Sequence, residues 1–224
     1  MGDVQRVWYV SYGSNLSRSR FLVYLQGGRV PGSAVLYRGC RDTAPPADDI
    51  PITLPHSLYF AGWSALVWGG TSAAFVTRAA QTPPALARAY LITEEQFLDV
   101  VRQENANGVA VDDFEPKVRQ ARRDGHTRLL STGTYTELLF CGERDGHPML
   151  TFTASADRVG LRAPSAAYLR VIGIGLRECH GLSTAEVVAY MIDRPGVEGA
   201  WTDAQLTDIF ESPHPHDAAA SGDD

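Results

Sequence analysis

Alternating apolar and polar stretches divide the chain into short strands and amphipathic helices. Short apolar or β-branched runs bounded by Gly, Pro and Asp are typical of strands. Apolar positions that recur every three or four residues predict helices. The pattern predicts strands at 7–10, 35–37, 58–60, 65–68, 73–76 and 87–92, a hairpin of 134–141 with 149–154, and helices at 17–26, 93–105, 165–179 and 183–193.

Strands outnumber helices and do not alternate strictly with them. This order favours an α+β fold, with a single small mixed β-barrel or sheet and surrounding helices. Residues 41–55 are rich in Pro and Asp and are predicted to form a loop, whereas 109–128 are polar, without a clean period, and predict a surface insertion or an irregular helix. We therefore expect one domain over residues 1–211 and a disordered acidic tail over 212–224.

The composition narrows the classes of partner. The 224 residues include 44% apolar and 21% charged residues, and the net charge is −6. This charge argues against a nucleic-acid partner held by phosphate contacts. No apolar run approaches the length of a membrane span, and the N-terminus lacks a secretory pattern. Cys40, Cys141 and Cys179 are too widely spaced for a CxxC site, so a cytoplasmic location is expected.

The loop Tyr12–Asn15 lies between a predicted strand and a predicted helix. Gly13 allows a backbone to approach a ligand closely or to adopt a positive φ. The N–H groups at the start of the following helix favour a negatively charged group. The alternative is an ordinary turn in which Ser17 caps the helix.

Glu104 lies on the apolar side of its predicted helix. At 100° per residue, Phe97, Val101 and Glu104 share one stripe. Burial of a carboxylate raises its pKa, and a glutamate with a pKa nearer neutrality can act as a general base. Alternatively, Glu104 reaches solvent from the last turn or pairs with an arginine.

Tyr168 begins a second inward stripe, which continues through Ile172 and Gly175. Gly173 and Gly175 weaken a helix, and are expected where another part of the chain packs closely. The Tyr168 hydroxyl could face a site or bond to a backbone carbonyl in the core.

Several kinds of catalytic centre are not indicated. The sequence has no G-x-S-x-G elbow, no HExxH, no CxxC and no P-loop. We therefore expect neither a metal nor another cofactor.

These motifs, taken in order, resemble the gamma-glutamylcyclotransferase-like family. The resemblance rests on Tyr12-Gly13-Ser14-Asn15-Leu16, on Trp68-Gly69-Gly70 before Ala73-Ala74-Phe75, on Leu98-Asp99 before Glu104, and on Pro164-Ser165 with Tyr168, Ile172, Gly175, Glu178 and Gly181-Leu182. It implies a small β-barrel with helices and an intramolecular aminolysis that releases 5-oxoproline and an amine. Glu104 would be the general base, and the residues implied to bind substrate are Tyr12, Gly13, Ser14, Asn15, Leu16 and Tyr168.

The sequence differs from the usual pattern of this family at two places, and both differences concern the choice of substrate. Asn105 follows Glu104 where the family usually has glycine, and the segment 109–128 is longer than a minimal member needs. We expect 109–128 to border the pocket and to set substrate choice. The implied partner is a small γ-glutamyl compound, and neither a nucleic acid nor a membrane is expected as a partner. The protein is expected to be a monomer or a homodimer. A hydrolase or amidase acting on a modified amino acid or natural product, and a non-catalytic binding module, remain as alternatives.

Overall fold

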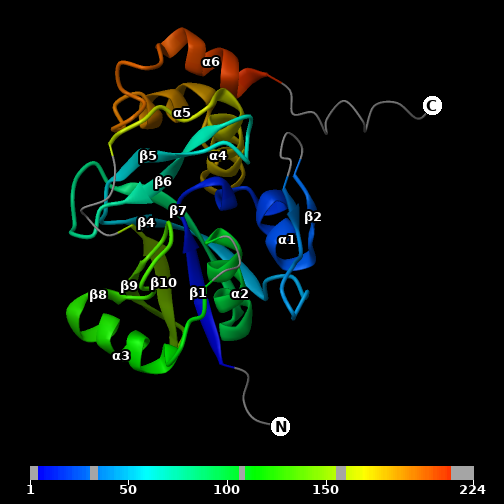
Figure 1. Ribbon diagram of the computed structural model, residues 1–224. Helices are drawn as coiled ribbons and strands as arrows, with labels where there is room; N and C mark the ends of the chain where they lie inside the picture. The colour runs from blue at the N-terminus through cyan, green and yellow to red at the C-terminus, as the bar shows by residue number, and fades with distance from the viewer. Residues whose placement is uncertain (1–4, 31–34, 106–108, 155–159, 213–224) are drawn as a thin grey trace.

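A six-stranded sheet forms the centre of the computed structural model, which describes residues 5–30, 35–105, 109–154 and 160–212. The strand order is β4-β7-β1-β10-β9-β8 (Figure 1). These strands are β1 (Arg6–Ser11), β4 (Asp48–Leu54), β7 (Ala85–Thr93), β8 (His126–Arg128), β9 (Glu137–Arg144) and β10 (His147–Thr153).

The sheet is mixed and open. β1 pairs in parallel with β10, and the other neighbouring pairs are antiparallel. In the described residues β4 and β8 are the two edges, and no pairing between them closes the sheet. The predicted α+β fold with a mixed sheet is therefore confirmed, whereas the predicted barrel form is wrong.

Two small antiparallel sheets lie beside the central one. The first joins β2 (Gly28–Arg29) to β3 (Leu36–Tyr37), and the second joins β5 (Leu58–Ser64) to β6 (Thr71–Val76). The turn between β5 and β6 contains residues 65–70. The strand predicted at 65–68 is thus a turn, in which Trp68 adopts a positive φ of 55°.

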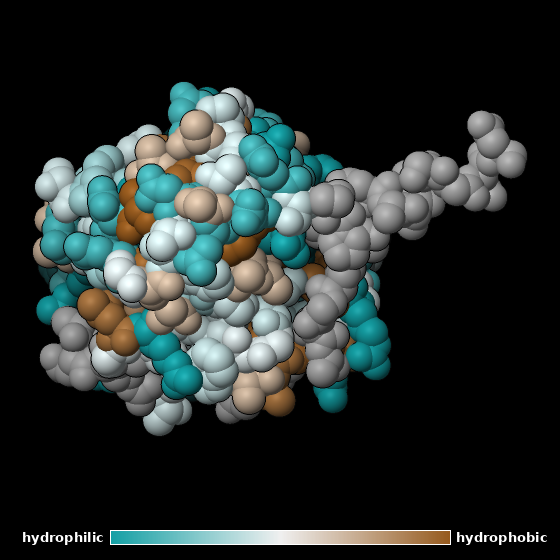
Figure 2. Space-filling view, turned by 90° about the horizontal axis from the view of Figure 1, so that it is seen from above, coloured by the Kyte–Doolittle hydropathy of each residue, from teal (hydrophilic) through white to brown (hydrophobic). Residues whose placement is uncertain are grey.

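The helices gather at three places around the sheets. In Figure 1, α4, α5 and α6 group at one end, α3 packs by β8 and β9 at the other, and α2 packs by β1 with α1 beyond it on the same side. Figure 2 views the first end, where hydrophilic and hydrophobic residues intermingle. The helices are α1 (Arg18–Gln26), α2 (Glu94–Glu104), α3 (Phe114–Asp124), α4 (Ala166–His180), α5 (Thr184–Met191) and α6 (Asp203–Glu211), with a 3-10 turn η1 (Ser14–Leu16) before α1.

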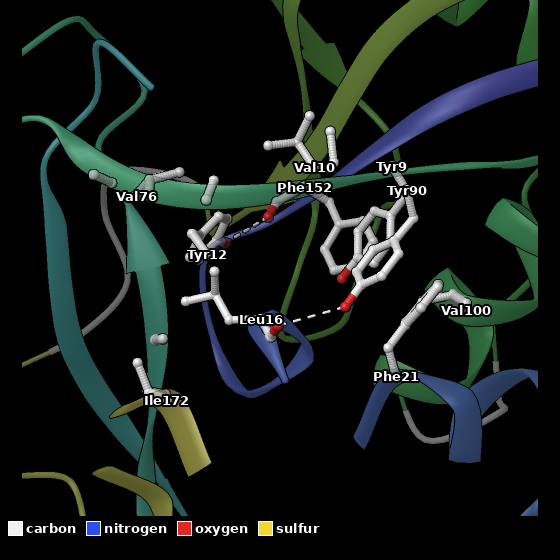
Figure 3. Close-up of a cluster of buried hydrophobic side chains, with 14 of the residues drawn as sticks. Tyr9, Val10, Tyr12, Leu16, Phe21, Val76, Tyr90, Val100, Phe152 and Ile172 are labelled. Carbon is white, nitrogen blue, oxygen red and sulfur yellow. Dashed lines mark hydrogen bonds between the residues drawn. The ribbon is translucent and has the colours of Figure 1, made fainter. Parts of the chain in front are cut away.

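An aromatic cluster fills the core where α1 and α2 meet the sheet (Figure 3). The Tyr9 ring lies 5.4 Å from those of Phe21 and Phe152, and Phe21 stacks on Tyr90 at 4.1 Å, all between ring centroids. Tyr9 and Tyr90 are also opposite each other in the β1–β7 pair. Buried aromatic pairs of this kind are worth about 0.5–1.5 kcal/mol beyond their area, so the strand that leads to the polar loop is firmly held.

Three segments differ from their predicted structure. Residues 41–55 contain strand β4, whose Pro51 is compatible with an edge of the sheet. Residues 109–128 contain a regular helix, α3, with Phe114 and Ala121 buried, followed by β8. Helix α6 was not predicted, although a capping box of Thr202 with Gln205 begins it.

The predicted tail over 212–224 lies outside the described residues apart from Ser212, and the domain limits remain a prediction. Of the helices in the described part of the chain, none has the length and apolar composition that crossing a membrane requires.

Candidate active site

The loop after β1 forms a compact 3-10 turn rather than running straight into a helix. The amides of Leu16 and Ser17 donate to the carbonyls of Gly13 and Ser14, at 3.0 and 3.2 Å. Those two amides are therefore used within the turn, which corrects the expectation that the helix start presents them to a ligand. Gly13, Ser14 and Asn15 instead line a narrow pocket of about 40 Å³.

Hydrogen bonds from neighbouring strands hold this loop in place. The Tyr12 hydroxyl donates to the Phe152 carbonyl at 2.6 Å, and the Tyr90 hydroxyl donates to the carbonyls of Asn15 and Leu16 at 2.8 and 3.5 Å (Figure 3). Leu16 is fully buried and lines neither of the pockets described here. Its place is therefore in the core, not with the substrate-binding residues that the resemblance implied.

Gly13 is required by close packing rather than by backbone conformation. Its φ is −108°, so the expected positive φ is wrong. A Cβ at this position would lie 3.2 Å from the Tyr168 hydroxyl and 3.5 Å from the Ala74 Cβ. Gly13 thus packs closely against Tyr168, whereas the expected close approach to a ligand stays a prediction.

Changing Tyr12 to phenylalanine tests whether this hydroxyl supports the loop or binds substrate. The Phe152 carbonyl would lose its 2.6 Å donor in a buried place. We expect the Tyr12→Phe variant to lose about 1–3 kcal/mol in the free energy of unfolding, measured by denaturant titration, with an unchanged KM for substrate. A raised KM without loss of stability would instead assign the hydroxyl to substrate binding.

Glu104 ends α2 and faces two adjoining pockets. A capping box of Thr93 with Gln96 begins the helix, and Phe97 and Val101 are fully buried on the same side. Glu104 itself is half-buried and lines both the narrow pocket and a wider one. Helix α2 thus packs one side into the core and places the Glu104 carboxylate at its end beside the pockets.

The surroundings of Glu104 raise the pKa of its carboxyl group. Burial raises the pKa of its carboxyl, while Arg20 and hydrogen bonds from Tyr24 and Asn15 partly offset that rise. The Asn15 Nδ2 donates to Glu104 Oε1 at 3.1 Å, which connects the carboxylate directly to the loop. A carboxyl group with a raised pKa next to a polar loop is suited to proton transfer.

The wider pocket has a volume of about 590 Å³ and joins the narrow one at Glu104. Ser14, Glu104, Tyr135 and Tyr168 line both. The volume is in the range of sites for small molecules. The fold therefore brings together residues from the loop, from α2 and from α4 around one cavity.

Tyr168 reaches this cavity from the first turn of α4, which Ser165 caps. Its ring lies 6.3 Å from that of Trp68, between centroids. Burial raises the pKa of its hydroxyl, and the backbone of Ala74 and Ser14 lowers it in part. Tyr168 is thus neutral at physiological pH, and its hydroxyl lies against the loop backbone.

Sequence reasoning missed further lining residues, among them Arg20, Tyr24, Tyr37 and Tyr135. Arg20 and Tyr24 are four residues apart, a spacing that places them on one face of α1. That spacing was the available signal, because both are buried on a helix that was predicted.

The segment 109–128 does not border the pockets. None of its described residues lines either one, which corrects the expectation that it sets substrate choice. The rim comes instead from residues 35–37, 64–68 and 133–135. Among the described residues, no group of three or more His, Cys, Asp or Glu is arranged to hold a metal ion.

Comparisons with known proteins give both a sequence relative and structural neighbours. No family model matches the chain. It is 34% identical to "Histone deacetylase 5" of Arabidopsis thaliana, over 83% of this chain but only 30% of the plant protein. A solved gamma-glutamyl cyclotransferase is similar at 13% identity and a TM-score of 0.48, covering 92% of this chain and 99% of that one. An uncharacterized protein from Homo sapiens is similar at 13% identity and a TM-score of 0.47, covering 93% and 99%.

Proposed function

We propose that the protein is a cofactor-free enzyme of the gamma-glutamylcyclotransferase type, with Glu104 as its general base. The supporting observation is the position of Glu104. It faces a pocket of about 590 Å³, contacts Asn15 of the polar loop, and has a pKa raised by burial.

The proposed reaction closes a five-membered ring within the substrate. Glu104 takes a proton from the substrate's α-ammonium group, and the freed nitrogen attacks the γ-carbonyl carbon. Glu104 passes that proton to the leaving nitrogen and then takes the second proton that the attacking nitrogen must lose. The C–N bond to the leaving amine breaks, and the second proton goes to that amine, which departs as an ammonium ion. The products are 5-oxoproline and an amine or amino acid, and no water is consumed.

Positioning would supply much of the acceleration, because the nucleophile and the electrophile belong to one molecule. The backbone of Gly13, Ser14 and Asn15 lines the narrow pocket beside Glu104. An oxyanion that develops on the γ-carbonyl would be stabilised by N–H donors in such a place. Tyr168, whose hydroxyl lies on the same wall, would help to orient the substrate.

A mass-spectrometric screen of γ-glutamyl amines and dipeptides tests this function. We expect release of 5-oxoproline from at least one compound, with no incorporation of oxygen from ¹⁸O-labelled water. Release of ¹⁸O-labelled glutamate would identify a hydrolase instead. If every compound stayed intact with well-folded protein, the proposed reaction would be wrong.

The pH dependence of kcat/KM provides a separate check on the base. Glu104 must be ionised to accept a proton, so activity is expected to rise with pH through its pKa. Because burial raises that pKa, the acidic limb should lie above the ordinary glutamate value of about 4.3. In an Asn15→Ala variant the limb should move still higher, because the hydrogen bond that favours the carboxylate is lost. A limb at the ordinary value in both proteins would contradict the assignment.

A further inference from the structure

Arg20 carries a buried positive charge on the wall of the wider pocket. It lies on α1, is only 5% exposed and lines that pocket together with Glu104. Its guanidinium carbon lies 4.2 Å from the centre of the Tyr24 ring and 4.4 Å from that of Tyr37. Two aromatic rings therefore fix the guanidinium in a defined place.

The hydrogen-bonding capacity of Arg20 is only partly used. Its Nη2 donates to the Tyr37 hydroxyl at 2.8 Å, but Nε and Nη1 have no hydrogen-bond partner among the described residues. None of the ion pairs formed by the described residues includes Arg20. Buried N–H groups are costly when they lack an acceptor, so these two nitrogens could be satisfied by a further acceptor such as an anionic ligand.

Glu104 provides the opposite charge beside Arg20. Tyr24 is a neighbour of both, because its ring stacks on the Arg20 guanidinium and its hydroxyl helps to lower the pKa of Glu104. The attraction of Arg20 also lowers the pKa of Glu104 in part. One wall of the pocket thus presents a cation and a carboxylate next to each other.

We propose that Arg20 binds the α-carboxylate of the γ-glutamyl substrate while Glu104 receives the α-ammonium group. This assignment rests on the proposed function, in which the α-ammonium group must reach Glu104. The α-amine and α-carboxylate share one carbon atom, so the carboxylate then lies within a few ångströms of the ammonium. A guanidinium can engage a carboxylate through two parallel N–H donors, either Nε with Nη2 or Nη1 with Nη2. Nη2 donates one of its two N–H groups to Tyr37, so its other N–H can form such a pair with Nε or with Nη1. The pair therefore selects compounds with a free α-amino acid end.

Paired ligands that differ only at the α-carboxylate test the assignment without requiring turnover. The probes are L-glutamine, the simplest γ-glutamyl amide, and its α-carboxamide, titrated by NMR against the full chain. The wild type is expected to prefer L-glutamine by about 10- to 100-fold, the range for hydrogen bonds to charged groups. Arg20→Met should abolish that preference, and Arg20→Lys, which keeps the charge but not the planar pair of donors, should reduce it.

Arg18→Met is the matched control. Arg18 lies two residues earlier on α1, but it is half-exposed, pairs with Asp49 and lies outside the pockets. This variant should keep the full preference for L-glutamine. If circular dichroism shows that Arg20→Met does not fold, the comparison is made with Arg20→Lys instead.

Equal binding of the two probes by the wild type would overturn the inference, and so would absence of binding by both. A preference that persists in a folded Arg20 variant would also overturn it, and would leave a carboxylate on the leaving group as the alternative partner of Arg20. A preference that depends on Arg20, without release of 5-oxoproline from any γ-glutamyl compound, would support the binding site and refute the proposed reaction.

Discussion

Replacing Glu104 with glutamine is expected to lower kcat for 5-oxoproline release by about 10²–10⁴-fold, equivalent to roughly 3–5 kcal/mol in barrier. Glutamine keeps the shape of the side chain and can still bond to Asn15, but it cannot accept the substrate's proton. The measurement is kcat at saturating concentration of a confirmed substrate. Near-normal turnover would rule out Glu104 as the base, and with it the proposed mechanism.

The stability of this variant should change little, in a direction set by the raised pKa of Glu104. A raised folded-state pKa means that the fold favours the protonated form. That stabilisation is complete below the unfolded pKa and is lost as pH rises through the folded one. Glutamine undergoes no such loss, so Glu104→Gln should be as stable as the wild type or slightly more stable at neutral pH.

Glu94→Gln is the matched control for this experiment. Glu94 begins the same helix, is half-buried and also has a pKa raised by burial, but it lines neither pocket. It should retain full turnover. A comparable loss of activity in Glu94→Gln would show that the effect comes from a disturbed helix rather than from a missing base.

A Gly175→Ala substitution is expected to impair both stability and turnover. An added Cβ would lie 2.4 Å from the backbone carbon and the Cβ of Leu16, and 2.4 Å from the Ser17 nitrogen. Backbone cannot move aside as a side-chain tip can, so the 3-10 turn or α4 must shift. Overpacking of this kind costs typically about 1–3 kcal/mol, against which alanine regains about 1 kcal/mol of helix propensity. Chemical denaturation and kcat/KM measure the two effects.

Gly173→Ala provides the comparison on the same helix. Its added Cβ would meet the ring of Phe210 on α6 at 2.5 Å, a side chain rather than backbone. Phe210 lies outside both pockets, so stability should fall while kcat/KM stays unchanged. If Gly175→Ala also kept full kcat/KM, the contact between α4 and the turn would not position the site.

Local signals in the sequence accounted for much of the framework around the site. The apolar stripe through Phe97 and Val101 predicted a helix over 93–105 with Glu104 on its inward side, and the structure contains that helix as α2. The glycines of α4 predicted close packing, which Gly175 shows against Leu16 and Ser17. These features depend on residues within a few turns of one another.

Features that depend on distant partners were not predictable in the same way. The environment of Arg20 includes Tyr37 from β3, and nothing local to either residue indicates that contact. Strand β4 resembled a loop because its edge position tolerates Pro51. The pocket rim was misassigned because polarity marked 109–128 as a surface segment but could not show which part of the surface it occupies.

The pocket rim and its floor come from different parts of the fold. The floor depends on the loop after β1, on α2 and on α4, all of which pack into the core, whereas the turn at 65–68 and the connection at 133–135 form the rim. Leu66 on this rim is 69% exposed, so its replacement removes little buried area. Substitutions on the rim that alter the preferred leaving group should therefore lower the free energy of unfolding only slightly. The rim is thus the natural target for a library that seeks new substrates while keeping the fold and the proposed base, Glu104.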